Sequence, residues 1–417
     1  MAKDPKTLIA VDLGTSSVRV AAARYSTPKD YELFALGQAP SLGIGRGLLE
    51  NVDQVSYAIR QACEDARLDE ATRGAEVVVG INGKHLASQN VSGQTVIGRG
   101  DGTVTERDVA KAIQAARELD LPADRYLLHH IPCGFRVDGF RCRRNPVGTR
   151  GKVACADTHV VTADAKVITD VKQAILMAGR ETHLVAANPI AASQAVLRRD
   201  EKERGVIMLD IGGGTMDIVA YNESALYHTS SFPLGGGHVI NDISIALNTS
   251  QPVAETVLKE HGMAVPDKAA ANEEVEIRCF GINGTRRFRK QYLFEVISLR
   301  LTEMFGIALE VVKKTGQPAP ASTVVLTGGL ANLPGIEKLA ERTLRMDTRI
   351  GIPPPQVYAA DTLKNPSYAA LIGMLQISSD ALFAPAPPPK AQANGGIAAG
   401  GLRILQQINQ RIDVLRS

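Results

Sequence analysis

The chain contains LIAVDLGTSSVRVAAA at residues 8–23 and VIMLDIGGGTMDIVAY at residues 206–221. Each stretch has the pattern of an apolar strand, an aspartate, a tight turn with glycine and threonine, and a second strand. A single turn of this kind is most often only a hairpin. Because two copies stand in one chain, the repeat predicts two duplicated domains that face each other and clamp a nucleotide from both sides.

The residue types in both turns suit a phosphate group. Glycine lets the backbone approach a phosphate and point N–H groups at it, and the threonine hydroxyl adds a further donor. A carboxylate at the end of the first strand can hold the water molecules of a magnesium ion. The pattern therefore indicates a nucleotide with Mg²⁺.

A third stretch fits the same picture. STVVLTGGLANLPGIEKLAERTL, at residues 322–344, predicts a strand, a turn at Gly328 and Gly329, and a helix beginning near Pro334. The two glycines would let an adenosine lie flat against the backbone. Taken alone, an ordinary strand-to-helix turn is the simpler interpretation.

Composition limits the class of protein. With 417 residues, 44% apolar and 22% charged, the chain is long enough for two or more domains with buried cores. The net charge of +3, without a long basic run interleaved with aromatics, argues against nucleic acid as the main partner. Five cysteines without CxxC spacing argue against a zinc site or a disulfide framework. Neither a signal peptide nor a membrane span is expected, which indicates a soluble, cytoplasmic body.

The last residues have a different character. A run rich in proline, alanine and glycine at residues 383–400 precedes GLRILQQINQRIDVLRS at residues 401–417. On a helical wheel one apolar arc is flanked by Arg411 and Arg416, and it holds Ile404, Leu405, Ile408, Ile412 and Leu415. The pattern predicts an amphipathic helix. It could fold back onto its own domain, whereas the linker favours binding to a membrane or a partner.

Together these motifs resemble the actin, Hsp70 and sugar-kinase superfamily. The resemblance implies an α/β, duplicated, two-lobed nucleotide-binding fold, with AANPIAASQAVL at 186–197 and YAALIGMLQ at 368–376 as connecting helices. It implies ATP and Mg²⁺ as cofactors, with Asp12 and Asp210 holding the metal through water and Asp210 as a candidate catalytic group in at most a slow ATPase. The implied nucleotide contacts are Asp12, Gly14, Thr15 and Ser16 (first phosphate loop), Asp210, Gly212, Gly213, Gly214 and Thr215 (second phosphate loop), Gly328 and Gly329 (adenosine motif), and Gly235, Gly236 and Glu255.

The segment between the first turn and the connecting helix distinguishes the branches. It contains HIP after a predicted helix, a VDG turn, NPVGTRG and THVVT, in that order. This segment is similar to subdomain 1C of the bacterial actin-like cell-division family FtsA, whose members end in a flexible linker and an amphipathic membrane helix. Alternatives are a PilM-like pilus-assembly ATP-binding protein, which lacks such a tail, or a sugar-type kinase of the same superfamily, although this chain has no Trp and only 4% aromatics.

The resemblance also implies a division into subdomains. The expected ranges are 1–83 (1A, first part), 84–162 (1C), 163–203 (1A, second part), 204–244 (2A, first part), 245–310 (2B), 311–355 (2A, second part), 356–382 (return to 1A), 383–400 (linker) and 401–417 (membrane helix).

The sequence departs from the family pattern at three places. The residues RCRR stand before NPVG. They make this stretch more basic than the family pattern, which is expected to alter a subunit contact. The lysine expected three residues after Glu255 is replaced by Leu258, with Lys259 following it. Asn188 stands where Hsp70-like members carry glutamate, so rapid hydrolysis is not expected.

The resemblance finally implies a role and partners. ATP and Mg²⁺ would close the lobes and favour head-to-tail filaments on the inner membrane at midcell, in which 1C supplies part of the contact. The chain would tether the FtsZ ring to anionic lipid and recruit later division proteins. The FtsZ C-terminal peptide would dock on 2B, against an apolar face of Leu293, Val296 and Ile297 and a basic face of Arg286, Arg289, Lys290 and Arg300.

Overall fold

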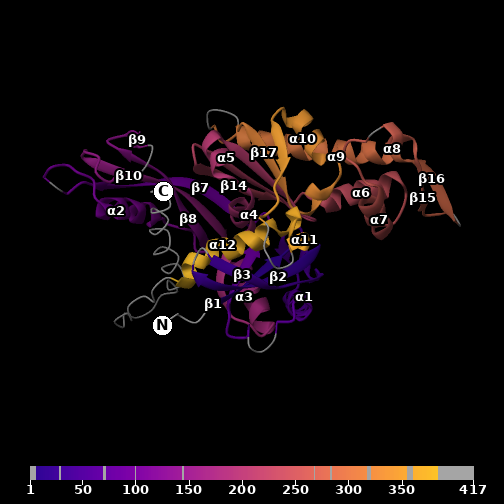
Figure 1. Ribbon diagram of the computed structural model, residues 1–417, viewed down its shortest axis with the longest axis horizontal. Helices are drawn as coiled ribbons and strands as arrows, with labels where there is room; N and C mark the ends of the chain where they lie inside the picture. Colours follow the sequence, from indigo (N-terminus) through magenta and orange to yellow (C-terminus); the bar gives the residue numbers. More distant parts are fainter. Residues whose placement is uncertain are drawn as a thin grey trace.

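The computed structural model describes residues 6–27, 30–68, 72–98, 100–142, 145–266, 268–281, 284–316, 321–354 and 360–383. These residues form two lobes, with one further subdomain extending from each (Figure 1). The linker and the amphipathic helix expected at 383–400 and 401–417 lie outside the described residues, apart from Phe383. No described helix is long and apolar enough to cross a membrane.

The first lobe is built on a five-stranded sheet. Its order is β11 (Thr182–Ala187), β6 (Glu76–Ile81), β1 (Lys6–Leu13), β2 (Ser17–Thr27) and β3 (Asp30–Pro40). Alternate residues of β1 enter two different cores: Ile9 and Val11 pack with α1 (Val52–Asp65) and α3 (Ala165–Met177), while Leu8 and Ala10 pack with α12 (Ala369–Phe383). This strand is apolar throughout because helices cover both faces of the sheet.

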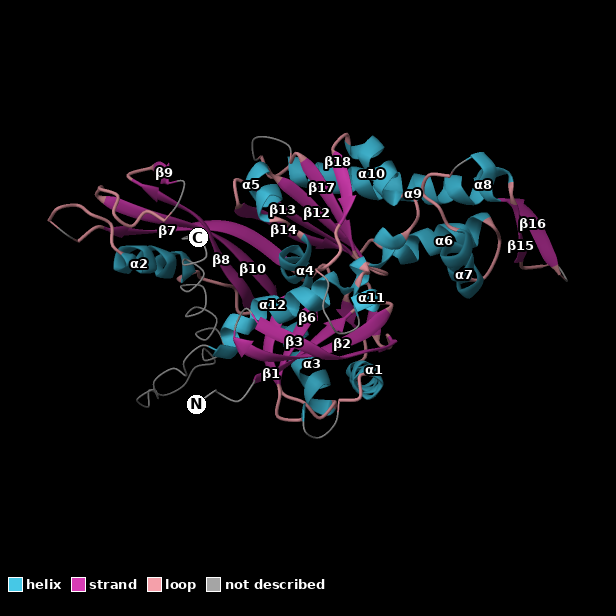
Figure 2. Ribbon diagram, in the orientation of Figure 1, coloured by secondary structure: helices cyan, strands magenta, loops and turns pink. Residues whose placement is uncertain are grey.

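The second lobe repeats this topology. Its sheet has the order β14 (Ala225–Phe232), β13 (Met216–Asn222), β12 (Val206–Ile211), β17 (Thr323–Thr327) and β18 (Asp347–Ile350). β12 pairs antiparallel with β13 and parallel with β17, just as β1 pairs antiparallel with β2 and parallel with β6. The predicted duplicated α/β fold is therefore confirmed. Figure 2 shows the two sheets one above the other, with helices between them.

Residues between β6 and α3 form a subdomain with its own sheet. Its strands lie in the order β7 (Ala87–Val96), β10 (Val153–Asp164), β8 (Arg125–Val137) and β9 (Phe140–Cys142), with α2 (Glu106–Arg117) packed against them. Thr105 and Asp108 cap the N-terminus of α2 with reciprocal hydrogen bonds. A side chain on Gly93 of β7 would overlap the α2 backbone, so glycine allows helix and sheet to meet.

This inserted subdomain also contacts the second lobe. Ser88 Oγ of β7 donates to the Thr229 carbonyl of β14 at 2.7 Å, and Asn90 Nδ2 donates to the Tyr227 carbonyl at 2.8 Å. The buried His159 of β10 lies 3.0 Å from Thr229 Oγ1 through Nε2. The insertion therefore belongs to the first lobe by sequence and is bonded to the outer strand of the second.

A helical subdomain extends from the second lobe at the opposite end of the molecule (Figure 1). It contains α6 (Gly236–Ala246), α7 (Gln251–His261), α8 (Lys268–Asn272), the hairpin of β15 (Glu274–Arg278) and β16 (Thr285–Arg289), and α9 (Lys290–Lys313). Leu293 and Ile297 of α9 are fully buried in the core of this lobe, so the apolar docking face expected from them is wrong. Leu301, Met304 and Phe305 of α9 are buried in the same core, whereas Tyr292 and Leu299 are exposed.

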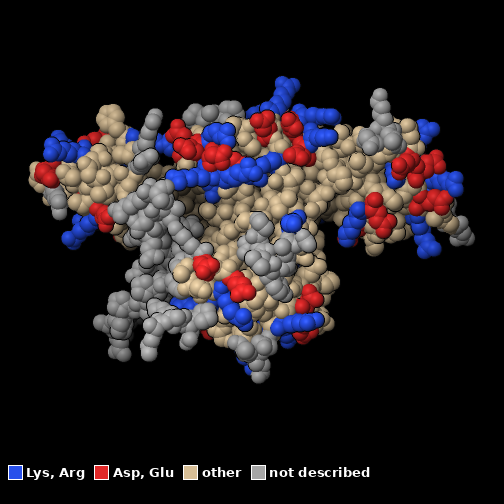
Figure 3. Space-filling model, in the orientation of Figure 1, with Lys and Arg blue, Asp and Glu red and all other residues tan. Residues whose placement is uncertain are grey.

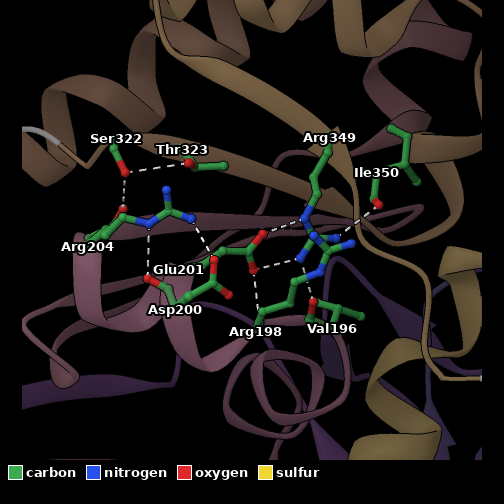
Figure 4. A network of polar contacts seen from close by, with 10 residues as sticks. Val196, Arg198, Asp200, Glu201, Arg204, Ser322, Thr323, Arg349 and Ile350 are labelled. Atoms are coloured by element: carbon green, nitrogen blue, oxygen red, sulfur yellow. Dashed lines mark hydrogen bonds and ion pairs between the residues drawn. The ribbon is translucent and has the colours of Figure 1, made fainter.

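The chain crosses between the lobes twice. The first crossing passes through α4 (Asn188–Val196) and α5 (Arg199–Arg204), and the second passes from β18 to α11 (Ala360–Leu363), η3 (Pro366–Tyr368) and α12. A side chain on Gly373 of α12 would overlap the Ala191 carbonyl of α4, so the two connecting helices cross in close contact. Figure 4 shows the ion pair between Glu201 of α5 and Arg349 of β18, which holds the first crossing to the second lobe.

Smaller elements complete the chain. β4 (Ile44–Gly45) and β5 (Leu48–Leu49) form a two-stranded ribbon, and η2 (Gly329–Asn332) leads into α10 (Ile336–Leu344). The helix expected near Pro334 begins at Ile336, because Gly335 has a left-handed φ of 79° and breaks the chain from η2. All five cysteines are free, in agreement with the expected lack of disulfides.

Candidate nucleotide-binding site

The two glycine turns meet face to face between the lobes. A Cβ added to Gly214 would lie 2.5 Å from Thr15 Oγ1, and one on Gly213 would overlap Ser16 Oγ. The expected first and second phosphate loops are thus in direct contact. Gly213 is not among the glycines with left-handed φ, so the nearness of Ser16 is what excludes a side chain there.

Asp12 ends the first strand and is buried. Asn188 Nδ2 donates to Asp12 Oδ1 at 2.8 Å, and Arg19 Nη1 lies 3.7 Å from Asp12 Oδ2. Burial raises the pKa of Asp12, although Arg19 and Asn188 act in the opposite direction. Asn188 is the first residue of α4, so the connecting helix begins at the first phosphate loop.

Asp210 occupies the equivalent place in the second lobe. Its pKa is raised well above the ordinary value, first because the carboxyl is buried and then because the carboxylates of Asp217 and Asp12 are close. When Asp12 and Asp210 are both ionised, their negative charges repel each other across the lobes. A cation between them would remove this penalty.

Asp217 is a site residue that sequence reasoning missed. It accepts a hydrogen bond from Ser231 Oγ, and Asn82 Nδ2 lies 3.5 Å from its other oxygen. Burial raises its pKa to about 7 despite these donors. A signal was available, because Asp217 directly opposes Asp210 across the β12–β13 hairpin, as Arg19 opposes Asp12 across β1–β2.

Residues of the first lobe support the loops with hydrogen bonds from both side chains and backbone. Asn82 Nδ2 donates to Thr215 Oγ1 at 2.8 Å, and Gly83 N donates to Ser231 Oγ at 2.8 Å. Gly47 N, in the turn between β4 and β5, donates to Thr15 Oγ1 at 3.3 Å. No motif marks these positions in the sequence.

Gly328 and Gly235 lie against the second loop. Gly328 has φ of 85°, and its Cβ would lie 2.6 Å from the Ile211 carbonyl, so only glycine fits. A Cβ on Gly235 would lie 2.6 Å from the Gly212 carbonyl. Gly329 has more room, because its Cβ would meet only Ser367 Oγ at 3.6 Å.

The first turn of α6 has a supporting role. Gly236 N donates to the Gly212 carbonyl at 2.9 Å and Gly237 N donates to the Gly213 carbonyl at 2.7 Å. These N–H groups, which a helix N-terminus leaves unpaired, hold the second loop in place. Gly236 therefore positions the loop through its backbone.

Glu255 lies on α7, where Lys259 Nζ pairs with its carboxylate at 2.7 Å. Leu258 is buried in the core of the second lobe. The lysine that the family pattern places at position 258 is thus replaced by a packing residue, while Lys259 stands beside Glu255 on the exposed side.

The carboxylates fit a metal held through water. Within the described residues, no group of three or more His, Cys, Asp or Glu side chains could hold a metal directly. Asp12 and Asp210 would instead accept hydrogen bonds from the water molecules of Mg²⁺, which would itself be bound to phosphate. Asn188 places an amide beside Asp12 and supplies no base for activating water.

The basic residues expected to bind a partner are not equivalent. Arg286 and Arg289 are exposed on β16, and Arg286 lies over the Phe288 ring at 5.2 Å. Lys290 pairs with Glu273 at 2.7 Å, and Arg300 pairs with Asp242 and Glu303, each at 2.6 Å. Figure 3 shows acidic and basic side chains intermixed at this end of the molecule.

Two sheets of the same topology, with glycine turns meeting between them, define an actin-like ATPase fold. A chain of the PilM–PilN type IV pilus biogenesis complex has this fold with a TM-score of 0.63 at 16% identity, covering 88% of this chain and 97% of that one. MreB5 of Spiroplasma citri bound to AMPPNP gives a TM-score of 0.51 at 14% identity, covering 88% of this chain and 94% of that one.

The sequence matches are more specific. Residues 207–373 match the family described as cell division protein FtsA, and residues 83–162 match the SHS2 domain inserted in FtsA. The cell division protein FtsA of Neisseria meningitidis serogroup B is 33% identical over 377 residues, which cover 90% of this chain and 91% of that protein. The chain belongs to the FtsA family of cell-division proteins. The expected resemblance is confirmed, and the PilM-like and sugar-kinase alternatives are not supported.

Proposed function

We propose that this FtsA-family protein binds ATP with Mg²⁺ between its lobes and forms membrane-bound filaments that tether the FtsZ ring. The observation that carries the proposal is the meeting of two glycine turns, each preceded by an aspartate, of which Asp12 is buried and Asp210 half-buried. Asp12 and Asp210 come from equivalent strands of the two lobes, so one ligand would contact both. A cation with polyphosphate is the ligand class that suits glycine backbones, hydroxyls and carboxylates together.

Each site residue then has a definite task. Thr15 and Ser16 from one lobe and Gly213 and Gly214 from the other would close on the phosphates. Gly328, beside the second loop, would leave room for the adenosine. Because the two loops touch, a nucleotide must separate Ser16 from Gly213, and the relative position of the lobes would then depend on the ligand. Asn188 supports slow turnover at most.

The shape of the molecule supports head-to-tail association. Val96 and Phe140 are large exposed apolar side chains on the inserted subdomain, and Ile245 and Leu299 are exposed on the helical subdomain. These subdomains lie at opposite ends of the molecule (Figure 1). Patches at opposite ends produce an open filament, since a heterologous contact need not close on itself.

The hairpin of β15 and β16 supports binding of an acidic peptide such as the FtsZ C-terminus. Arg286 and Arg289 supply exposed positive charge, and Tyr292 at the start of α9 is a partly exposed aromatic. This surface replaces the face expected from Leu293 and Ile297. Arg300 and Lys290 contribute less, because each already has an acidic partner.

The membrane role is proposed from sequence alone. α12 ends at Phe383, and the linker and amphipathic segment follow it. The apolar arc of that segment suits the interface of a bilayer, and its arginines suit anionic headgroups.

The proposal is tested by titrating the full chain with a fluorescent ATP analogue, with Mg²⁺ and with EDTA. We expect saturable binding that Mg²⁺ strengthens at least about tenfold, a difference of about 1.4 kcal/mol. Pelleting with phosphatidylglycerol vesicles then tests the membrane role separately. Absence of nucleotide binding under both conditions would reject the proposed site, whatever the result with vesicles.

A further inference from the structure

Side chains of the inserted subdomain bond to β14 at alternate residues. Ser88 Oγ donates to the Thr229 carbonyl at 2.7 Å and accepts from the Thr229 N–H at 3.3 Å. Asn90 Nδ2 donates to the Tyr227 carbonyl at 2.8 Å, and His159 lies 3.0 Å from Thr229 Oγ1 through Nε2. Ser88 and Asn90 are two residues apart on β7, so both project from the same face of the strand. We call the contacts of Ser88, Asn90 and His159 with Tyr227 and Thr229 the β7–β14 strap.

His159 gives the strap a single arrangement of hydrogen bonds. Its side chain is fully buried, and burial lowers the pKa of the imidazole to about 3, so the ring is neutral. Nδ1 lies 2.7 Å from Asn90 Oδ1, which only accepts, because Asn90 Nδ2 is the atom that donates to Tyr227. Nδ1 therefore carries the proton, and Nε2 accepts from the Thr229 hydroxyl. Separating the two sides of the strap would leave His159 and Thr229 without these partners, at a cost in free energy.

The row of contacts continues into the proposed nucleotide site. Gly83 N donates to Ser231 Oγ at 2.8 Å, and Ser231, the next residue on this face of β14, donates in turn to Asp217. Asn82 Nδ2 donates to Thr215 Oγ1 of the second phosphate loop at 2.8 Å. Asn82 and Gly83 follow β6 and lead into the inserted subdomain. The root of the insertion is therefore bonded directly to the second loop.

The contacts also continue away from the site. Cys133 Sγ of β8 donates to the Leu226 carbonyl at 3.0 Å, and Arg141 of β9 pairs with Glu223 in the turn that precedes β14. Figure 1 shows β14 beside β7 and β8 on this side of the molecule. The second lobe is thus bonded to the insertion along the whole of β14.

Entry of a nucleotide would oppose these contacts. A Cβ on Gly213 would lie 2.0 Å from Ser16 Oγ, so a ligand between the two loops must move them apart. Thr215 belongs to the same loop as Gly213, and Asn82 holds it against the root of the insertion. Movement of the second loop away from Ser16 also moves β14 relative to β7, since β12, β13 and β14 form one sheet. The strap stabilises the arrangement in which the loops touch, and the ligand favours the arrangement in which they are apart.

We propose that the β7–β14 strap holds the two phosphate loops in contact and that nucleotide binding releases it. This inference rests on the proposed nucleotide site and adds a regulation of that site. Two sites that bias the same pair of arrangements influence each other equally, so the coupling is reciprocal. A nucleotide would free the inserted subdomain from β14, and any contact that draws the subdomain away from β14 would tighten nucleotide binding.

The first experiment measures nucleotide affinity in a variant that lacks the strap. Ser88→Ala removes one side chain of the strap, and Asn90→Asp keeps the acceptor for His159 while it places a carboxylate oxygen against the Tyr227 carbonyl. We expect the double variant to bind a fluorescent ATP analogue with Mg²⁺ at least about fivefold more tightly than the wild type, the factor that one net hydrogen bond contributes. Gln89→Glu is the control and should bind like the wild type, because it adds the same charge to an exposed side chain on the other face of β7.

The second experiment follows release of the strap directly. Burial raises the pKa of the Cys133 thiol to about 12, so the thiol stays protonated and reacts slowly while the insertion lies against β14. We expect alkylation of Cys133, followed by mass spectrometry, to be faster in the double variant than in the wild type. In the wild type it should be faster with Mg²⁺ and AMPPNP than without them. Cys279 is the internal control, since its buried thiol contacts the Leu247 carbonyl in the helical subdomain, at the other end of the molecule (Figure 1).

The outcomes separate the strap from the proposed nucleotide site. Unchanged or weaker nucleotide binding in the double variant, or an equal gain in Gln89→Glu, would overturn the proposal. An equal rise in alkylation at Cys133 and Cys279 would do so as well, because it shows a general loosening of the fold. Failure of the wild type to bind nucleotide would instead reject the proposed site, and the alkylation of Cys133 without nucleotide would then decide whether the strap holds the insertion. Unfolding midpoints confirm that every variant is folded.

Discussion

Arg349 donates two parallel hydrogen bonds to Glu201, from Nε to Oε1 at 2.6 Å and from Nη2 to Oε2 at 2.7 Å (Figure 4). The same Nη2 donates to the Val196 carbonyl, the last of α4, at 2.8 Å. Glu201 lies in α5, within the first crossing between the lobes, and Arg349 lies in β18, where the second crossing begins. This ion pair therefore ties the two crossings to each other.

Glu201→Gln should destabilise the protein by about 3 kcal/mol, because it leaves the Arg349 guanidinium without its buried partner. Burial would raise the pKa of Glu201, but hydrogen bonds from Arg349 and Arg198 N outweigh it and leave the pKa lowered. Urea unfolding measures the loss. Arg204→Gln is the control, since Arg204 pairs with Asp200 on the exposed side of the same helix, and it should change stability by less than about 1 kcal/mol. Equal effects would contradict the role given to Arg349.

Gly213→Val should abolish binding of a fluorescent ATP analogue, because its side chain would fill the space between Gly213 and Ser16. Gly306→Ala is the control and should bind normally, since Gly306 lies on α9, away from the loops, and its added methyl meets no atom within 4 Å. If Gly213→Val bound as tightly as wild type, nucleotide would not lie between the loops.

Asp210→Ala should weaken binding in Mg²⁺ more than in EDTA. Burial and the nearby carboxylates of Asp217 and Asp12 raise the pKa of Asp210, so a cation is needed to favour its charged form. Titrations in Mg²⁺ and in EDTA give the affinity of the variant relative to that of the wild type under each condition. An equal loss under both conditions would show that Asp210 acts on the fold and not on the ion.

Two buried histidines should lower stability between pH 6.5 and pH 5.5, in opposition to Asp217, whose raised pKa of about 7 acts in the other direction. Burial lowers the pKa of His159 to about 3 and that of His85 to about 4, from the usual 6.5. At these two histidines the unfolded chain therefore binds more protons than the folded one below pH 6.5, so each histidine costs up to about 1.4 kcal/mol by pH 5.5. His159→Gln should reduce the slope of the unfolding midpoint against pH. An unchanged slope would place the titrating groups elsewhere.

Arg286→Glu with Arg289→Glu should weaken binding of an FtsZ C-terminal peptide, and the wild-type affinity should fall with salt. ATP affinity should not change, since these residues lie on the hairpin and not at the loops. Arg300→Glu makes a poorer test, because it also places an acid beside Asp242 and Glu303. Unchanged peptide affinity in the double variant would show that the partner site lies elsewhere on the protein.

The tail prediction concerns residues outside the described structure. Burial of the five aliphatic side chains of the apolar arc would contribute at most about 8 kcal/mol to the free energy of membrane binding. Partial burial and the entropy lost when the helix becomes ordered reduce this contribution. Ile408→Glu, in the apolar arc, should release a fluorescent fusion into the cytoplasm, whereas Gln407→Glu on the polar face should do far less. Equal release by both variants would mean that the helix does not lie face-down in lipid.

The repeated turn was enough to predict the duplicated fold, because a buried strand ending in Asp and Gly constrains both the sheet and the site. The repeated turn also indicated Gly213, and the separate stretch at residues 322–344 indicated Gly328, because a glycine in a tight turn can be recognised in the sequence. Asn82 and Gly47 could not be predicted, since they reach the loops through tertiary contacts and have no local motif. Leu293 and Ile297 were misplaced for a related reason: periodicity shows that a helix has an apolar face and does not show what covers it.

The bonds from Ser88, Asn90 and His159 to β14 have one more consequence. β14 is the outermost strand of its sheet, and such a strand exposes backbone groups that can recruit a strand from another chain. Ser88 and Asn90 donate to the β14 carbonyls at Thr229 and Tyr227, and thus occupy backbone groups that a strand from another chain would need. The inserted subdomain therefore protects the protein against edge-to-edge aggregation.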